Sequence, residues 1–191
     1  MGDDERTSVA FEQQEAAIPP VWTAISTSAP TCSLKGEPPF TVITKYENTG
    51  SRSICALVRL YSHHGSGIEI RDPSRNHRRI GPPSTMIQDD FDEEAQDLED
   101  TQLVRLEPGQ TFETSYTFSV VPKLDGIRNS DVRNMVVGNT YVITLKKRRW
   151  RWVFEDEMPH GLDDEEARHL LRKRHAAEWS VDCTVRFDAT E

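Results

Sequence analysis

Hydrophobic and polar residues alternate most regularly in the segment 112–120. One set of alternate positions carries Phe112, Thr114, Tyr116, Phe118 and Val120, and the positions between them are all polar. Residues two apart on a strand point to the same face. The pattern therefore predicts a strand with one buried and one wet face, as in an antiparallel sheet.

The same period, or a run of β-branched and aromatic residues, predicts further strands. Segments 40–46 and 52–61 flank turn residues at 47–51, so we expect them to form a hairpin. In its second strand, one face would carry Ile54, Ala56, Val58 and Leu60. The remaining predicted strands are 67–71, 101–107, 141–145 running on to 154, and 179–187, the last with an apolar face of Trp179, Val181, Cys183, Val185 and Phe187.

One helix is predicted near the C-terminus, at about 163–175. Acidic residues fill its first turn at 163–166 and basic residues its last at 172–174, which matches the helix dipole. Ala167, Leu170 and Leu171 form a narrow apolar stripe at helical spacing.

The chain divides into a tail and one domain. Residues 1–20 are polar and end at Pro19-Pro20, which predicts a disordered N-terminal tail. Residues 21–191 are expected to form a single β-sandwich domain. A loop at about 72–100 would interrupt it, and its part 89–100 holds eight acidic residues and no basic one, which favours a solvated segment.

About seven to nine short strands with one late helix, and no alternation of strands with helices, predict a mainly β fold. The fold class that fits is an antiparallel immunoglobulin-like β-sandwich.

Four motifs follow one another in the chain: Glu-Asn-Thr-Gly-Ser-Arg at 47–52, Gly-Ile-Glu-Ile at 67–70, Leu-Glu-Pro-Gly-Gln-Thr at 106–111 and Gly-Asn-Thr-Tyr-Val at 138–142. With Trp150-Arg-Trp152 downstream, the segment 40–154 resembles immunoglobulin-like modules and also a group of uncharacterised intracellular fungal proteins. The resemblance implies a sandwich fold and an intracellular compartment, and it implies no activity. Cys55 and Cys183 depart from the Cys…Trp…Cys arrangement of antibody-type domains.

Charge and cysteine content indicate which cellular compartment the protein occupies. The 191 residues carry 23 Lys+Arg and 32 Asp+Glu, a net charge of −9. No run approaches the ~20 apolar residues of a membrane helix, and residues 1–15 show no secretory signal. Three cysteines are too few for a disulfide framework. We therefore expect a cytoplasmic protein without membrane association, in which Cys55 and Cys183 are core or half-buried thiols rather than nucleophiles.

Candidate metal and catalytic residues are few. Three histidines, His63, His64 and His77, could ligate zinc together with carboxylates such as Asp72. Their spacing matches no zinc motif, so solvated loop histidines are the favoured interpretation. The acidic run lacks the order of a calcium-binding EF-hand loop. The chain has no nucleophile elbow, phosphate-binding loop or dinucleotide fingerprint. We expect no metal and no cofactor, and no catalytic residue is identified.

The segment 146–151 is the most suggestive, because five of its six residues are basic and tryptophans stand at 150 and 152. It could neutralise phosphates and stack on bases, or lie on anionic lipid. On a strand, however, Trp150, Trp152 and Phe154 would face the core and the arginines solvent, and the net charge of −9 opposes nucleic-acid binding. The structural interpretation is favoured. A third hypothesis has the acidic residues of 89–100 shielding this basic segment from an anionic partner.

The preferred function is therefore a non-catalytic intracellular interaction or binding module. The alternative is a cofactor-independent enzyme of the isomerase or cyclase type, or a small-molecule carrier, with an aromatic pocket in the sandwich. The candidate binding residues for a protein partner or small molecule are Trp150, Trp152, Arg149, Arg151, Tyr116 and Trp179. Neither nucleic acid nor membrane is expected, and the oligomeric state is open.

Overall fold

A computed structural model describes residues 17–59, 68–80, 101–120, 132, 134–145 and 148–191, without the side chains of Arg59 and Arg149. Within these residues the chain is mainly β, as the alternation predicts, with one α-helix, α2 (Asp164–Arg172). One-turn 3₁₀ helices stand at Pro73–Arg75 and Glu155–Glu157. The strands are β1 (Val21–Thr27), β2 (Thr31–Ser33), β3 (Thr41–Asn48), β4 (Ile54–Arg59), β5 (Ile68–Asp72), β6 (Arg78–Ile80), β7 (Thr101–Leu106), β8 (Thr111–Thr117), β9 (Thr140–Leu145), β10 (Arg148–Phe154), β11 (Ala177–Trp179) and β12 (Thr184–Thr190).

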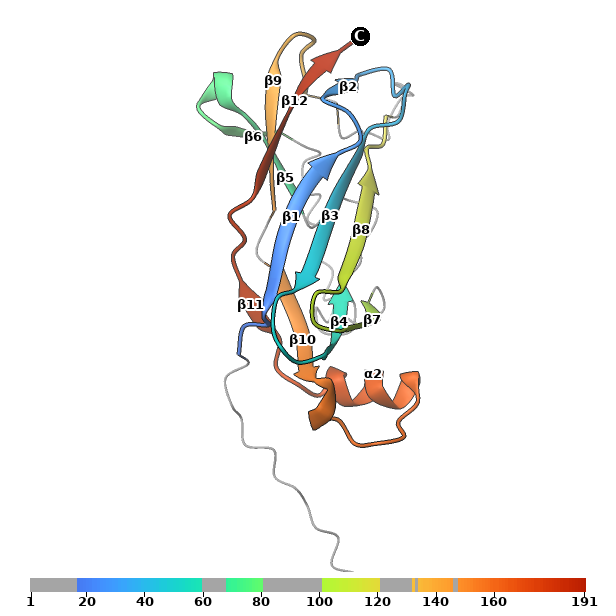
Figure 1. Ribbon diagram of the computed structural model, residues 1–191. Helices are drawn as coiled ribbons and strands as arrows, with labels where there is room; N and C mark the ends of the chain where they lie inside the picture. The colour runs from blue at the N-terminus through green and yellow to red at the C-terminus, as the bar shows by residue number, and fades with distance from the viewer. Residues whose placement is uncertain (1–16, 60–67, 81–100, 121–131, 133, 146–147) are drawn as a thin grey trace, which may run out of the picture.

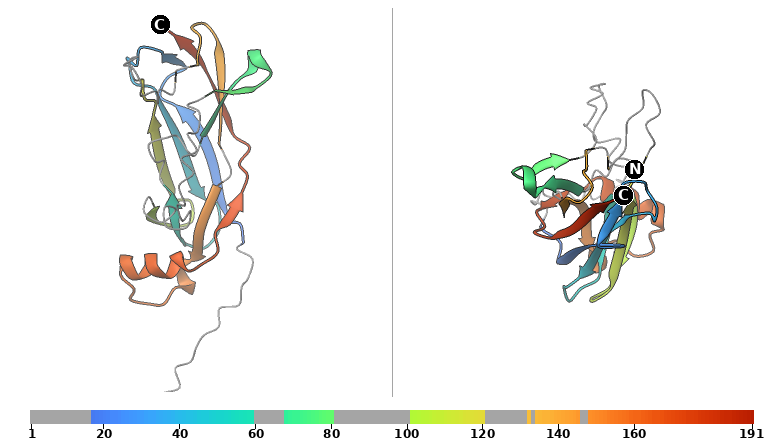
Figure 2. Two further views of the ribbon diagram at one scale, coloured as in Figure 1. Left: turned by 180° about the vertical axis from the view of Figure 1, so that it is seen from behind. Right: turned by 90° about the horizontal axis from the view of Figure 1, so that it is seen from above.

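The strands lie in two layers (Figure 1). The front layer is a three-stranded sheet of order β1-β3-β8. Behind it stand a four-stranded sheet, β11-β10-β4-β7, in the lower half and a five-stranded sheet, β2-β12-β9-β5-β6, in the upper half. Among the described ladders, every pair is antiparallel except β2 with β12. Figure 2 shows the β5–β6 hairpin projecting from the upper sheet and α2 lying across the lower end.

The rear layer is interrupted at mid-height. The strands β4 and β5, β10 and β9, and β11 and β12 stand in the same order in the two rear sheets. The β10–β11 ladder ends at the pair Arg148–Trp179, whereas the β9–β12 ladder begins at Thr144–Thr184. In the described segment 180–183, the chain passes from the four-stranded to the five-stranded sheet outside both ladders.

Each half of the molecule has its own core. In the upper half, aromatic rings from the front layer meet rings from the five-stranded sheet: Phe40, Phe118, Tyr141 and Phe187. In the lower half, Tyr46 of the front layer packs on Trp150 at 5.1 Å between ring centroids. Burial of these rings is the main force that holds the layers together.

The strand β4 is apolar on both faces because both are covered. Ile54, Ala56 and Val58 enter the lower core. Cys55 and Leu57 face the other way and pack with the fully buried Leu171 of α2. A capping box starts α2: the Asp163 carboxylate accepts from two backbone N–H groups while Glu166 accepts from the Asp163 N–H. The predicted helix and the buried Cys55 thiol are confirmed.

Three expectations about local structure are wrong. The segments 40–46 and 52–61 form no hairpin, because β3 pairs with β1 and β8 whereas β4 pairs with β10 and β7. The continuous strand expected at 179–187, like the one expected at 141–154, is two strands in different sheets. The loop expected at 72–100 begins with a 3₁₀ turn and strand β6.

Several expectations fall on other parts of the chain. The acidic run 89–100, His63, His64 and most of the predicted tail at 1–20 lie outside the described residues. None of the described helices is long and apolar enough to cross a membrane.

Candidate binding surface

Two of the predicted binding residues are core residues. Trp150 is 2% exposed and Trp179 is 8% exposed. Their rings meet edge to face at 5.4 Å, a favourable geometry for aromatic pairs. Both belong to the lower core, so they stabilise the packing of the two layers.

The other two aromatic candidates are half-buried and lie apart. Trp152 packs on Phe154 at 5.0 Å, and its indole Nε1–H donates to the Ala17 carbonyl at 2.6 Å. Tyr116 packs against the upper core, near Phe118 at 6.0 Å. The structure therefore places Tyr116 in a different cluster from the three tryptophans.

The described part of the basic segment is not a wet face. Arg151 is half-buried, and its Nε–H donates to the Arg174 carbonyl at 2.9 Å. Arg148 is 8% exposed and lies 6.0 Å from the Tyr46 ring centroid. Strand alternation puts Arg148 on the same face as Trp150, which is why it points inward. Lys146, Lys147 and the Arg149 side chain lie outside the described residues.

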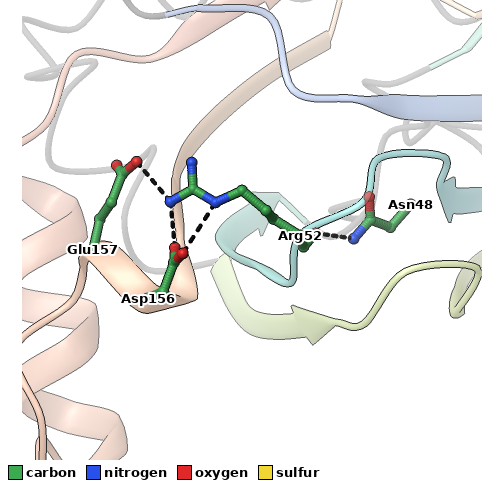
Figure 3. A network of polar contacts seen from close by, with 4 residues as sticks. All are labelled: Asn48, Arg52, Asp156 and Glu157. Atoms are coloured by element: carbon green, nitrogen blue, oxygen red, sulfur yellow. Dashed lines mark hydrogen bonds and ion pairs between the residues drawn. The ribbon is translucent and has the colours of Figure 1, made fainter.

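Exposed arginines at the lower end are held by carboxylates, in an arrangement that we call the lower clamp (Figure 3). The Arg52 guanidinium bonds to Asp156 and, at 2.9 Å, to Glu157. It also lies 3.8 Å from the Phe154 ring centroid. Arg105 donates to Asp164 at 2.7 Å and pairs with Glu155 at 3.6 Å. The clamp thus fastens the turn after Glu155 and the start of α2 to the sandwich.

The buried side-chain amide of Asn48 holds the backbone at Arg52, next to the lower clamp. The Asn48 Nδ2 donates to the carbonyls of Arg52 at 2.8 Å and Leu106 at 2.9 Å, and its Oδ1 accepts from Gly50 N at 3.0 Å. Asn48 is 0% exposed. Figure 3 shows this amide beside the backbone of Arg52.

Hydrogen bonds from Arg52 lower the pKa of Asp156, so the carboxylate stays ionised near neutrality.

A second group of arginines lies on the outer face of the five-stranded sheet. Arg186 of β12 pairs with Val142 of β9, Val142 pairs with Arg71 of β5, and Arg71 pairs with Arg79 of β6. The alternation of each strand keeps the three arginines exposed on one face. We call Arg186, Arg71 and Arg79 the arginine row.

Among the residues that the structure describes, few acidic groups lie next to the arginine row. On its face, Glu69 lies 3.3 Å from Arg71, and Asp188 accepts a hydrogen bond from Thr140 at 2.5 Å. Among the described residues, Arg79 and Arg186 form no ion pair. Like charges directly opposite each other on neighbouring strands destabilise a sheet. The Arg71–Arg79 pair therefore costs stability, which points to a use other than folding.

The tip of the β5–β6 hairpin is fixed. The Asp72 side chain is buried and accepts from Ser74 N at 2.9 Å and Ser74 Oγ at 2.6 Å, and its second oxygen lies 3.6 Å from Arg75 Nε. Asn76 and His77 follow with φ of 52° and 55°. Consecutive left-handed residues other than glycine are uncommon and store strain. The turn presents Arg75, His77 and Arg78 to solvent beside the arginine row.

This surface was not predicted from the sequence. Five basic residues stand among the nine positions 71–79, which is a detectable pattern. The contribution of Arg186 could not be found this way, because only the strand order places it on the same sheet face as Arg71, two strands away.

The described residues offer little for catalysis. No group of three or more His, Cys, Asp or Glu side chains among them is placed to hold a metal ion. His77 is exposed at the hairpin tip. Burial raises the pKa of the Cys55 thiol to about 11 and also raises the pKa of Cys183. Such thiols stay protonated at neutral pH and are poor nucleophiles.

Comparison with known proteins identifies no family. No family model matches the chain, and no curated protein matches it. Among solved structures, a β-glucosidase from Erythrobacter marinus shares 15% identity over 89% of this chain and 15% of its own, with a TM-score of 0.35. The protein assigned as ApaA from Bordetella pertussis shares 13% identity over 91% of this chain and 98% of its own, also with a TM-score of 0.35. At these TM-scores neither likeness bears on function.

Proposed function

We propose that the chain is a non-catalytic interaction module that binds an acidic segment of a protein partner on the arginine row. The observation that carries this proposal is the directly opposed pair Arg71–Arg79, exposed on a projecting hairpin in a chain of net charge −9. An anionic partner would relieve the repulsion between the two guanidinium groups, and arginine forks match carboxylates well.

The two β layers serve this function as a scaffold, in the manner of an immunoglobulin-like β-sandwich. Binding residues on a sheet face are held more rigidly than residues on a free loop. The three cysteines, none of them in a disulfide, support a reducing intracellular setting.

A second candidate function is that of a small-molecule carrier or cofactor-independent enzyme. One observation favours it: three buried polar atoms, Thr23 Oγ1, Thr114 Oγ1 and Trp179 Nε1, have no hydrogen-bond partner among the described residues. A ligand with acceptor oxygens could satisfy them. It would have to separate the packed pair Trp150–Trp179, which makes this candidate the weaker one.

The test is peptide binding measured by fluorescence anisotropy at low ionic strength. The probe is a fluorescein-labelled oligoglutamate peptide, titrated with wild-type protein and with Arg71→Glu/Arg79→Glu. We expect the variant to lose at least about tenfold in affinity, because each reversal removes an attraction and adds a repulsion. Added salt should weaken wild-type binding.

The matched control is Lys35→Glu/Lys173→Glu, which changes the net charge by the same amount at exposed positions off the sheet face. Equal loss of affinity in both variants would show that net charge alone determines the binding, and the proposal would be rejected. Tighter binding of a duplex DNA than of the peptide would also reject it. Circular dichroism establishes that each variant keeps its fold.

A further inference from the structure

The arginine row has a spacing that bears on the kind of anion it recognises. Arg71 and Arg79 are cross-strand partners, and Arg186 stands two strands away with Val142 between. Neighbouring strands lie about 4.8 Å apart, so Arg186 is about 10 Å from Arg71 across the sheet. The row thus offers one close pair of guanidinium groups and one separate guanidinium group.

The close pair suits a dianion better than a carboxylate. One arginine fork already satisfies a carboxylate with two parallel hydrogen bonds. A phosphoryl group carries about −1.5 to −2 charges and three acceptor oxygens, which two arginines can share. Glu69, 3.3 Å from the Arg71 Nη2, holds the Arg71 guanidinium toward the outer face and leaves its other donors for a ligand.

The position of Arg186 sets the distance between the two acidic groups of the partner segment. An extended peptide rises about 3.3 Å per residue, so about three residues span the gap between the pair and Arg186. Val142 is half-buried between them and offers a small apolar surface to the intervening residues.

We infer that the partner segment is phosphorylated, with its phosphoryl group held between Arg71 and Arg79 and an acidic side chain about three residues away on Arg186. The inference rests on the proposed function, because it assigns the chemistry of the same surface. A phosphorylated protein segment fits better than an anionic membrane, because Val142, the apolar residue between Arg71 and Arg186, is half-buried.

The experiment compares three labelled peptides that share one sequence. One carries serine and glutamate at the inferred spacing, the second carries phosphoserine in place of the serine, and the third carries phosphoserine with glutamine in place of the glutamate. We expect the phosphoserine–glutamate peptide to bind at least about tenfold tighter than its unphosphorylated form. The reason is that the phosphoryl group forms charge-assisted hydrogen bonds with the arginines that the serine hydroxyl cannot form.

Single substitutions separate the two contacts. Arg79→Ala should remove the gain from phosphorylation and keep the gain from glutamate, whereas Arg186→Ala should do the reverse. Lys173→Ala, on an exposed side chain beyond the end of α2, should change neither. Thermal unfolding checks that the variants are folded.

The outcomes also distinguish this inference from the proposed function. Equal affinity for the serine and phosphoserine peptides, with binding still dependent on Arg71 and Arg79, overturns the phosphoryl assignment alone. Binding of none of the three peptides overturns both proposals. Tighter binding of phosphatidylserine vesicles than of the phosphopeptide overturns the assignment to a protein segment.

Discussion

Exposed arginines are used in opposite ways at the two ends of the molecule. In the lower clamp, Arg52 and Arg105 each contact two carboxylates from the segment 155–164. In the arginine row, Arg71 and Arg79 face each other, and within the described part of the chain Glu69 beside Arg71 is the acidic group in contact. The difference teaches that local charge balance, rather than net charge or the number of basic residues, separates a structural arginine from a candidate binding arginine.

The largest effect on stability is expected from Leu171, the buried residue of α2. Leu171→Ala removes a fully buried side chain that packs on Cys55, Leu57 and Val153. It should lower the free energy of unfolding by about 2–5 kcal/mol, as large-to-small core changes do. Urea denaturation measures the loss, and peptide binding at the arginine row should be unchanged.

Leu170→Ala is the matched control, because Leu170 is half-exposed. Alkylation gives a second measure of the Leu171 substitution. The high pKa and burial of the Cys55 thiol protect it from iodoacetamide near pH 8, and Leu171→Ala should increase its reactivity. A Leu170 variant as unstable as the Leu171 variant would show that α2 does not dock as described.

The Asn48 amide gives the next largest effect. Asn48→Ala leaves the carbonyls of Arg52 and Leu106 without their donor in a buried site. We expect the free energy of unfolding to fall by about 1–3 kcal/mol. Ser51→Ala, at an exposed position of the same turn, should change it by less than about 0.5 kcal/mol. Similar losses in the two variants would contradict the bonding role of the amide.

Substitutions in the lower clamp and in the arginine row should change the free energy of unfolding in opposite directions. Arg79→Ala removes a like-charge contact and should raise the free energy of unfolding by up to about 0.5 kcal/mol. Arg105→Ala removes contacts to Glu155 and Asp164 and should lower it. Thermal unfolding of both variants beside the wild type tests the contrast, which fails if Arg79→Ala is the more destabilised.

The smallest effect is a pH dependence in the lower clamp. Because Arg52 lowers the pKa of folded Asp156, the clamp stabilises the fold above the ordinary carboxyl pKa of about 4 and loses this contribution as the pH falls through the lowered value. The stability difference between wild type and Asp156→Asn should therefore shrink between pH 7 and pH 3. Parallel denaturation curves at these pH values measure it, and a constant difference would argue against the ion pair.

The alternation of residues predicted where strands lie and which face each buries. It succeeded for 112–120, where Thr114 and Phe118 are buried, the other residues of their face are half-buried, and the polar residues of the opposite face are exposed. It failed for the partners of 40–46 and 52–61, because a strand with the same buried face can pair in either layer. It also continued through 180–183, where Val181 and Cys183 still pack against the cores although the pairing changes from β10 to β9.

The candidate surface was less predictable than the fold. The aromatic and basic residues at 146–152 stand out in the sequence, yet Trp150 and Arg148 are buried by the same alternation that makes the strand. The arginine row depends on the register of β12, β9, β5 and β6, which brings Arg186 and Arg71 together from positions far apart in the chain. Single-sequence patterns carry no information on such register.

The interruption of the rear layer has a consequence for how the molecule opens. The front sheet β1-β3-β8 spans both halves, whereas the two rear sheets have separate ladders and largely separate cores, so the rear sheets can open as distinct cooperative units. Amide protons of the five-stranded sheet would then exchange with deuterated solvent on a different timescale from those of the four-stranded sheet. A partner bound on the upper sheet would slow exchange in that half and leave the half beneath α2 to exchange at its own rate.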